Sequence, residues 1–179
     1  DRVKKNGWNW KRPYGLSALD NEPVVHINFN EAENYCKWNK KRIPTLKEWE
    51  LAAYTEFRPN NKDGYKFKKS YPYPTGENTL GLNCLNDCNF NYPSKYSKFL
   101  LRGYGHVSTS STKKGINGLY DMGGNVWEWV DINDNSYKGT KGGSWWYGKN
   151  QMIQGYNATK PKNMSAVYIG FRCVKDFKN

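Results

Sequence analysis

The stretch that decides the fold reads Gly115-Ile-Asn-Gly-Leu-Tyr-Asp-Met-Gly-Gly-Asn-Val-Trp-Glu-Trp-Val130. Its two adjacent glycines let the backbone take a positive φ or pass close to another group. Asn125 and Glu128 then bring two oxygen-bearing side chains three residues apart, beside the main-chain carbonyls of the turn. Oxygen ligands of this kind suit Ca²⁺ better than a transition metal. The stretch therefore predicts a calcium site formed by Gly123, Asn125, Val126 and Glu128. The alternative is a buried turn in which Asn125 caps the chain and Glu128 pairs with a lysine.

The segment Gly118–Trp129 resembles the signature of the formylglycine-generating-enzyme family, also called the sulfatase-modifying-factor family. Further blocks similar to family sequences occur in the matching order: Pro23–Cys36, Lys41–Glu50, and Gly142–Trp145 with Ile169–Cys173. The resemblance implies an α+β, complex C-type-lectin-like fold with two main helices, small antiparallel sheets and much irregular loop. It also implies one domain over residues 1–179, with family blocks at 8–55 and 115–175.

Composition limits the classes of partner. The chain has 179 residues, of which 16% are aromatic, whereas disordered chains contain few aromatic residues. Its formal net charge of +12 favours acidic partners. The lysines are scattered, however, and no nucleic-acid-binding motif is present, so sequence-specific nucleic-acid binding is not expected. No apolar run is long enough to span a membrane. The sequence leaves the oligomeric state open.

Periodicity predicts a few short elements. Residues 24–29 alternate like a strand, and Asn30 with Glu33 forms a capping box for a helix whose inner face includes Ala32, Tyr35 and Cys36. Thr45 and Glu48 form a second capping box, before a helix with a buried stripe of Leu46, Trp49, Ala52 and Ala53. Residues 1–22 and 56–114 are expected to be irregular, and residues 167–173 to form a closing strand.

The four cysteines allow three pairings. Cys84 and Cys88 could be half of a zinc site, but the other half is missing, so zinc is not favoured. The family resemblance implies a Cys36–Cys173 disulfide, and Cys84–Cys88 would be an additional local bridge. Two disulfides would indicate a periplasmic or secreted protein. The alternative is four buried thiols in a cytosolic chain.

The resemblance also bears on chemistry, because formylglycine-generating enzymes oxidise a sulfatase cysteine with a copper ion held by two cysteines. Tyr147 and Met152 occupy the two corresponding positions, and no cysteine lies between Ser144 and Cys173. No copper site is therefore expected. Trp129 and Ser144 match other positions that line the family's pocket. Asn83 and the Cys84 carbonyl are weaker candidates for a second calcium site.

The leading hypothesis is a non-oxidase module, stabilised by structural Ca²⁺, that binds a protein, peptide or glycan. The net charge permits an acidic ligand, although scattered lysines are more typical of a solvated surface. The ligand would lie in an aromatic groove formed by Trp129, Ser144, Trp145 and Tyr147. The main alternative is an enzyme of the same superfamily, of formylglycine-generating or non-haem-iron type, whose chemistry depends on a partner domain. A structural or assembly protein is a third class.

Overall fold

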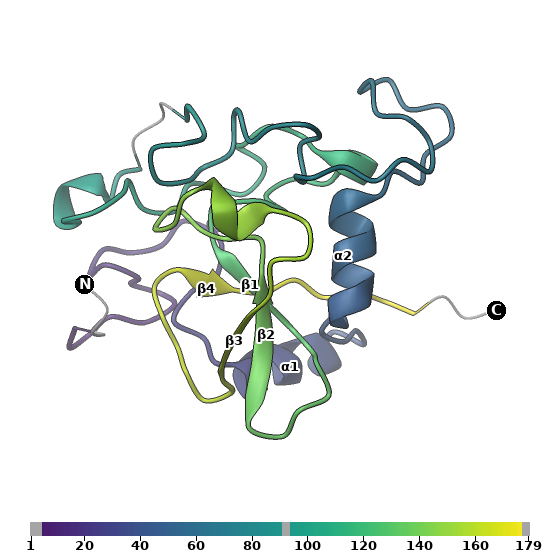
Figure 1. Ribbon diagram of the computed structural model, residues 1–179. Helices are drawn as coiled ribbons and strands as arrows, with labels where there is room; N and C mark the ends of the chain where they lie inside the picture. The colour runs from purple at the N-terminus through teal and green to yellow at the C-terminus, as the bar shows by residue number, and fades with distance from the viewer. Residues whose placement is uncertain (1–4, 91–93, 177–179) are drawn as a thin grey trace.

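The computed structural model describes residues 5–90 and 94–176. Its centre is one four-stranded sheet with strand order β3-β2-β1-β4 (Figure 1). The strands are β1 (Trp127–Val130), β2 (Tyr137–Lys141), β3 (Ala158–Pro161) and β4 (Ile169–Gly170). β2 pairs antiparallel with both β1 and β3, but β4 runs parallel to β1. The predicted fold class, with two helices, a small sheet and much loop, is confirmed. The sheet is mixed and not purely antiparallel, because the chain crosses over after β3 and returns beside β1 in the same direction.

Two helices accompany the sheet: α1 (Phe29–Trp38) and α2 (Leu46–Tyr54). Thr45 caps α2, and the Thr45 and Glu48 side chains each accept the other's backbone N–H, as predicted. The capping box of α1 consists of Asn28 and Glu31 instead of Asn30 and Glu33. The helix therefore begins earlier than predicted, which places Phe29 in the core. Short 3₁₀ turns occupy Ser97–Phe99 (η1), Ile116–Gly118 (η2) and Lys149–Met152 (η3).

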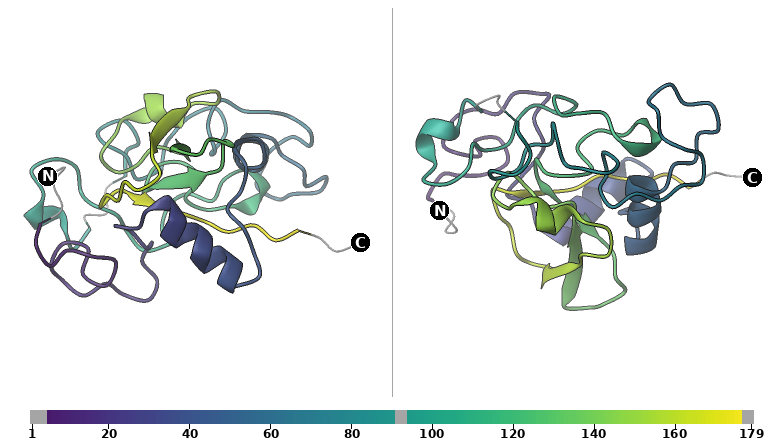
Figure 2. Two further views of the ribbon diagram at one scale, coloured as in Figure 1. Left: turned by 90° about the horizontal axis from the view of Figure 1, so that it is seen from below. Right: turned by 45° about the horizontal axis from the view of Figure 1, so that its top comes forward.

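Helix α1 lies beside the C-terminal segment (Figure 2, left), and the Cys36–Cys173 disulfide joins them across 137 residues. Ala32 and Cys36 are fully buried, as the predicted stripe requires. Tyr35 is 49% exposed, because it lies at the edge of that stripe, with its ring 5.6 Å from the ring of Phe171. The inward face of α1 is thus narrower than predicted.

The strand predicted at residues 24–29 is absent, and the one predicted at residues 167–173 is shorter than expected. Residues 24–27 form no strand, because His26 has a φ of +58° that interrupts an extended run. Residues 26 and 29 nevertheless bond through their main chains to residues 166 and 162. The closing strand is limited to β4, because Ile169 and Gly170 alone pair with β1.

The long segment between α2 and β1 is irregular over its described residues, as predicted; it lies above the sheet in Figure 1. Within it, the fully buried Glu56 carboxylate pairs with Arg58 and accepts the Asn117 N–H. The Cys84–Cys88 disulfide closes a small loop further along. Residues 91–93 of this segment, and residues 1–4 of the predicted N-terminal segment, lie outside the described residues. None of the helices described has the length and apolar content needed to cross a membrane.

Candidate functional site

Strand β1 separates two environments, because successive side chains of a strand point to opposite faces. Trp127 and Trp129 belong to the largest buried cluster, together with Trp145 and Trp146. Glu128 points to the other side, where its carboxylate contacts α2. The residues predicted for the two sites therefore lie on different faces: Glu128 of the predicted calcium site on one, and Trp129 of the predicted aromatic groove on the other.

Glu128 is held by three donors. Its Oε2 accepts the Trp49 indole N–H at 2.7 Å and the Arg172 Nε–H at 2.6 Å, while its Oε1 accepts from Arg172 Nη2 at 2.6 Å. Burial disfavours the charged form of Arg172, but the attraction of Glu128 outweighs it and raises the Arg172 pKa. The partner of Glu128 in this structure is therefore an arginine that lies 44 residues away in the sequence, in place of the lysine considered as an alternative.

Asn125 caps a neighbouring loop. Its Oδ1 accepts from the Val107 N–H at 2.9 Å and from Asn83 Nδ2 at 3.3 Å, and its Nδ2 donates to the Val107 carbonyl. An amide oxygen has two lone pairs, and these two donors occupy both of them on Asn125. Asn83, proposed for a second site with Cys84, thus lies directly against Asn125. Of the side chains predicted to bind calcium, Asn125 Oδ1 is thus already occupied by two donors, and both oxygens of Glu128 accept hydrogen bonds from Arg172.

A groove of about 940 Å³ opens beside this turn, lined in part by Asn125, Val126 and Glu128. Asp121 also lines it and accepts hydrogen bonds from the Thr112 hydroxyl and the Ser110 N–H. Burial raises the pKa of this carboxyl group despite those bonds. The groove therefore has both a fixed ion pair and an acid of raised pKa in its wall.

On the opposite face, the structure buries most of the predicted aromatic groove. Trp129, Ser144 and Trp145 each have 0% exposure. The Trp129 indole N–H bonds to the Ile27 carbonyl, and the Ser144 hydroxyl accepts the Trp146 N–H. These three side chains therefore stabilise the interior, and Tyr147 alone of the four is partly exposed.

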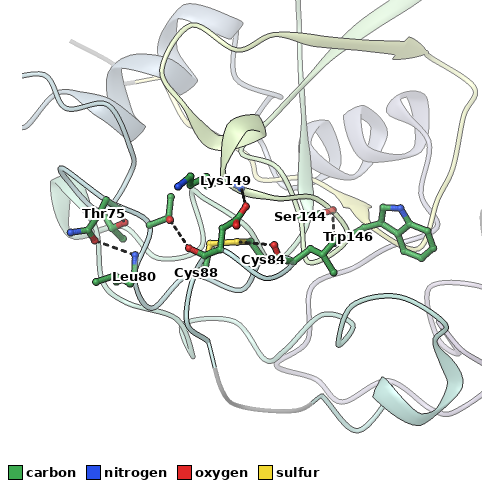
Figure 3. The surroundings of a disulfide bond; sticks show 11 residues. Thr75, Leu80, Cys84, Cys88, Ser144, Trp146 and Lys149 are labelled. Atoms are coloured by element: carbon green, nitrogen blue, oxygen red, sulfur yellow. Dashed lines mark hydrogen bonds between the residues drawn. A yellow bond between two sulfur atoms is a disulfide. The ribbon is translucent and has the colours of Figure 1, made fainter.

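The turn that carries Tyr147 is attached to the small disulfide loop (Figure 3). The Leu85 N–H donates to the Tyr147 carbonyl at 3.0 Å, and Asp87 Oδ2 accepts the Lys149 N–H at 3.2 Å. Met152 is fully buried, in one cluster with Leu82 and the two cysteines of this loop. Tyr147 is therefore at the surface and Met152 in the interior.

Both predicted disulfides are confirmed. Cys36 pairs with Cys173 and Cys84 with Cys88, and these four are the only cysteines of the chain. No thiol of the sequence is left to bind a metal. Among the residues described, no group of three or more His, Cys, Asp and Glu side chains is arranged to hold a metal ion.

Sequence reasoning missed Trp127, which contacts Tyr147, and two further neighbours of the Trp127 ring, Tyr156 and Lys160. The Trp127 ring centre lies 5.5 Å from that of Tyr147 and 6.2 Å from that of Tyr156, and the Lys160 Nζ lies 5.9 Å above the Trp127 ring. Burial lowers the pKa of Lys160. The residues Ala158–Pro161 carry no local pattern that indicates the burial of Lys160 or its aromatic neighbours.

A model of the sulfatase-modifying factor enzyme 1-like domain matches residues 2–177. The chain belongs to this family. Among curated proteins, it is 31% identical over 134 residues to the formylglycine-generating enzyme of Streptomyces coelicolor, which covers 71% of this chain and 38% of that enzyme. It is 35% identical over 145 residues to the inactive C-alpha-formylglycine-generating enzyme 2 of Bos taurus, covering 76% of this chain and 44% of that protein.

The chain thus spans less than half the length of these two relatives. Among solved structures, CarF superimposes with a TM-score of 0.60 at 19% identity, covering 88% of this chain and 69% of CarF. That likeness supports the fold alone. Members of this family bind calcium and copper, and both active and inactive relatives are similar to this chain.

Proposed function

We propose that this chain is a non-oxidase binding module of the family, which recognises a protein, peptide or glycan at the surface around Tyr147. Structural Ca²⁺ at the Gly123–Glu128 turn is part of the proposal. So is an extracytoplasmic location, because disulfides persist in oxidising compartments. The observation that carries the proposal is the state of the cysteines, since all four are used in two disulfides.

Copper(I) is bound by soft thiolate ligands. In this chain, the positions that resemble the family's copper cysteines hold a phenol at Tyr147 and a thioether at Met152. Met152 is fully buried against the Cys84–Cys88 loop, while Tyr147 is partly exposed. These two side chains offer no thiolate to a metal, which supports a role other than cysteine oxidation.

The partly exposed aromatic surface supports a binding role. Tyr147 packs edge-on against both Trp127 and Tyr168, so its ring is fixed before any ligand arrives. A rigid aromatic side chain with a polar end is well suited to recognition, because little conformational entropy is lost on binding. One relative bears the name of an inactive formylglycine-generating enzyme, which is consistent with a family scaffold used without oxidation.

The decisive experiment is an oxidation assay. The purified protein is incubated with copper and oxygen and a cysteine-containing sulfatase peptide, with an active formylglycine-generating enzyme as positive control. We expect no aldehyde product by mass spectrometry and no stoichiometric copper after dialysis. Turnover would contradict the proposal and would favour the alternative, an enzyme of the same superfamily.

The binding role is tested separately. An array of glycans and peptides is probed with the wild-type protein and with Tyr147→Ala, and Tyr137→Ala, an exposed tyrosine of β2, is the matched control. We expect the Tyr147 variant to lose binding and the control to keep it. If Tyr147→Ala bound the same ligands as the wild type, the proposed surface would be wrong.

A further inference from the structure

Strand β3 carries a lysine whose charge is not neutralised by any acidic group of the described residues. Lys160 is half-buried, and burial alone lowers its pKa. Two lysines of the adjacent strand β2 differ in this respect: Lys138 pairs with Asp131 at 2.7 Å, and Lys141 with Glu50 at 2.9 Å. Partial burial of an ammonium group without an anion beside it costs free energy. Lys160 is therefore placed to bind an anionic group of a ligand.

The Trp127 ring, over which this ammonium group lies, carries a hydrogen-bond donor without a partner among the described residues. The Trp127 indole is 1% exposed, and its N–H has no acceptor among the described residues. A buried donor without a partner is less favourable than a paired one, because it has given up its hydrogen bond to water. The ring is flanked by Tyr147 and by Tyr156, which is 36% exposed. The Trp127 N–H is itself closed to solvent, so a ligand at Lys160 would contact the partly exposed rings of Tyr147 and Tyr156.

We propose that Lys160, held over the buried Trp127 ring, forms with Tyr147 and Tyr156 a binding site for the carboxylate of an extended acidic peptide. This inference rests on the proposed function and names its ligand class. A single ammonium matches the single charge of a carboxylate, whereas phosphate and sulfate groups are more often held by arginine forks. The net charge of +12 also favours an acidic partner.

The position of Lys160 in the sheet favours a peptide over a glycan. β3 is the outer strand of the sheet and pairs with β2 on one side only among the described strands. An extended peptide can add to such an edge through main-chain hydrogen bonds, while pockets beside the edge select its side chains. Lysine and proline at an edge also discourage indiscriminate pairing, and β3 has both, at Lys160 and Pro161. An acidic peptide combines the charge that Lys160 attracts with the main-chain groups that a sheet edge can pair.

The experiment measures fluorescence anisotropy of a short labelled peptide in which Glu alternates with Val, and of the same peptide with Gln in place of Glu. The protein variants are Lys160→Met, which keeps the stem and removes the charge, and Lys160→Arg, which keeps the charge. The matched control is Lys162→Met, since Lys162 is also half-buried and has no side-chain ion pair among the described residues. A uronic acid oligosaccharide is titrated in parallel.

We expect the wild type to prefer the Glu peptide by about tenfold or more, the value of one charge-assisted hydrogen bond. Lys160→Met should abolish this preference, while Lys160→Arg and Lys162→Met should keep it. Equal affinity for the two peptides, no binding of either, or an equal loss in the Lys162 control would overturn the inference. Tighter binding of the oligosaccharide that depends on Lys160 would also overturn it, because the site would then be one for a glycan. If a ligand lost binding in Tyr147→Ala but kept its affinity in Lys160→Met, the inference would fail while the proposed function stood.

Discussion

Glu22 connects the N-terminal segment to the loop that carries His106. Its carboxylate accepts hydrogen bonds from the Tyr96 hydroxyl and, at 2.7 Å, from Lys95 Nζ. It also lies 3.3 Å from His106 Nε2. Burial opposes ionisation of Glu22, but the hydrogen bonds from His106, Lys95 and Tyr96 outweigh it and lower its pKa to about 2. The ionised form of this carboxyl group is thus favoured by the fold.

The sign of the resulting pH dependence follows from linkage. Since the folded pKa of Glu22 lies below its ordinary value of 4.5, its stabilising effect is complete above pH 4.5 and is lost as the pH falls towards 2. Burial lowers the pKa of His106 below its ordinary 6.5, so the unfolded chain takes up this proton first and His106 reduces the stability as the pH falls below 6.5. We expect Glu22→Gln to lower the free energy of unfolding near neutral pH by about 1–3 kcal/mol, measured by urea titration. Between pH 4.5 and 2, this variant should lose less stability than the wild type loses.

The control for this experiment is Glu33→Gln, which removes an exposed pair with Lys37 on α1. Such pairs contribute little, so the control should follow the wild-type urea curve at every pH. An unchanged acid slope in Glu22→Gln would show that Glu22 is not the group that titrates.

Calcium at the central turn gives a second prediction at this scale. With Glu128 and the carbonyls of Gly123 and Val126 as ligands, an ion bound only by the folded chain raises the Tm by mass action. We expect the Tm to rise with added CaCl₂ and to fall after treatment with EDTA. Glu128→Gln should remove the calcium dependence. A Tm unaffected by either treatment would show that Arg172 alone neutralises Glu128.

At the scale of elements, α2 offers the clearest prediction. Thr45 Oγ1 accepts the Glu48 N–H, and the Glu48 side chain accepts the Thr45 N–H in return. Loss of such an N-cap costs about 1 kcal/mol. We therefore expect Thr45→Ala to lower the free energy of unfolding by that amount in urea titration. Lys47→Ala, at an exposed position of the same turn, should be nearly neutral; an equal loss in both variants would argue against a capping effect.

The two helices also show what the sequence can and cannot predict. Thr45 and Glu48 were identified correctly because one capping box was available. The start of α1 was misplaced because the chain offers two Asn-x-x-Glu boxes, at Asn28 and at Asn30. The choice between them depends on a distant contact, since the Phe29 N–H donates to the Lys162 carbonyl. Local pattern carries no information about such a contact.

The same limit applies to the site. The turn at residues 123–128 could be located from the sequence, and Glu128 could be expected to need a partner. Its partner, Arg172, comes from the segment after β4, and Lys160 meets Trp127 only because β3 and β1 flank the same strand. Trp129 and Trp145 looked like ligand-binding residues because aromatic residues serve both recognition and core packing, and the fold uses them for packing.

At the scale of the whole molecule, the two disulfides close loops of very different length. One joins residues 137 apart and the other residues 4 apart. Loop-closure entropy assigns about 5 kcal/mol to the first and about 2 kcal/mol to the second. We therefore expect Cys36→Ala/Cys173→Ala to lose considerably more stability in urea than Cys84→Ala/Cys88→Ala.

The experiment measures which of the two double cysteine variants loses more stability. Reduction of the wild-type protein breaks both bridges, so it should lower the stability by more than either double variant does. If the small-loop variant were the less stable of the two, the Cys84–Cys88 bridge would act chiefly through the folded state, by holding the turn at Tyr147 and Lys149.

The Cys36–Cys173 bridge has a further consequence for how the molecule responds to damage. Nearly the whole irregular surface layer lies between its two ends, including the segment above the sheet. A protease that cleaves this layer leaves both products covalently joined. The nicked molecule would run as a single band on a non-reducing gel and separate into fragments only after addition of a reductant.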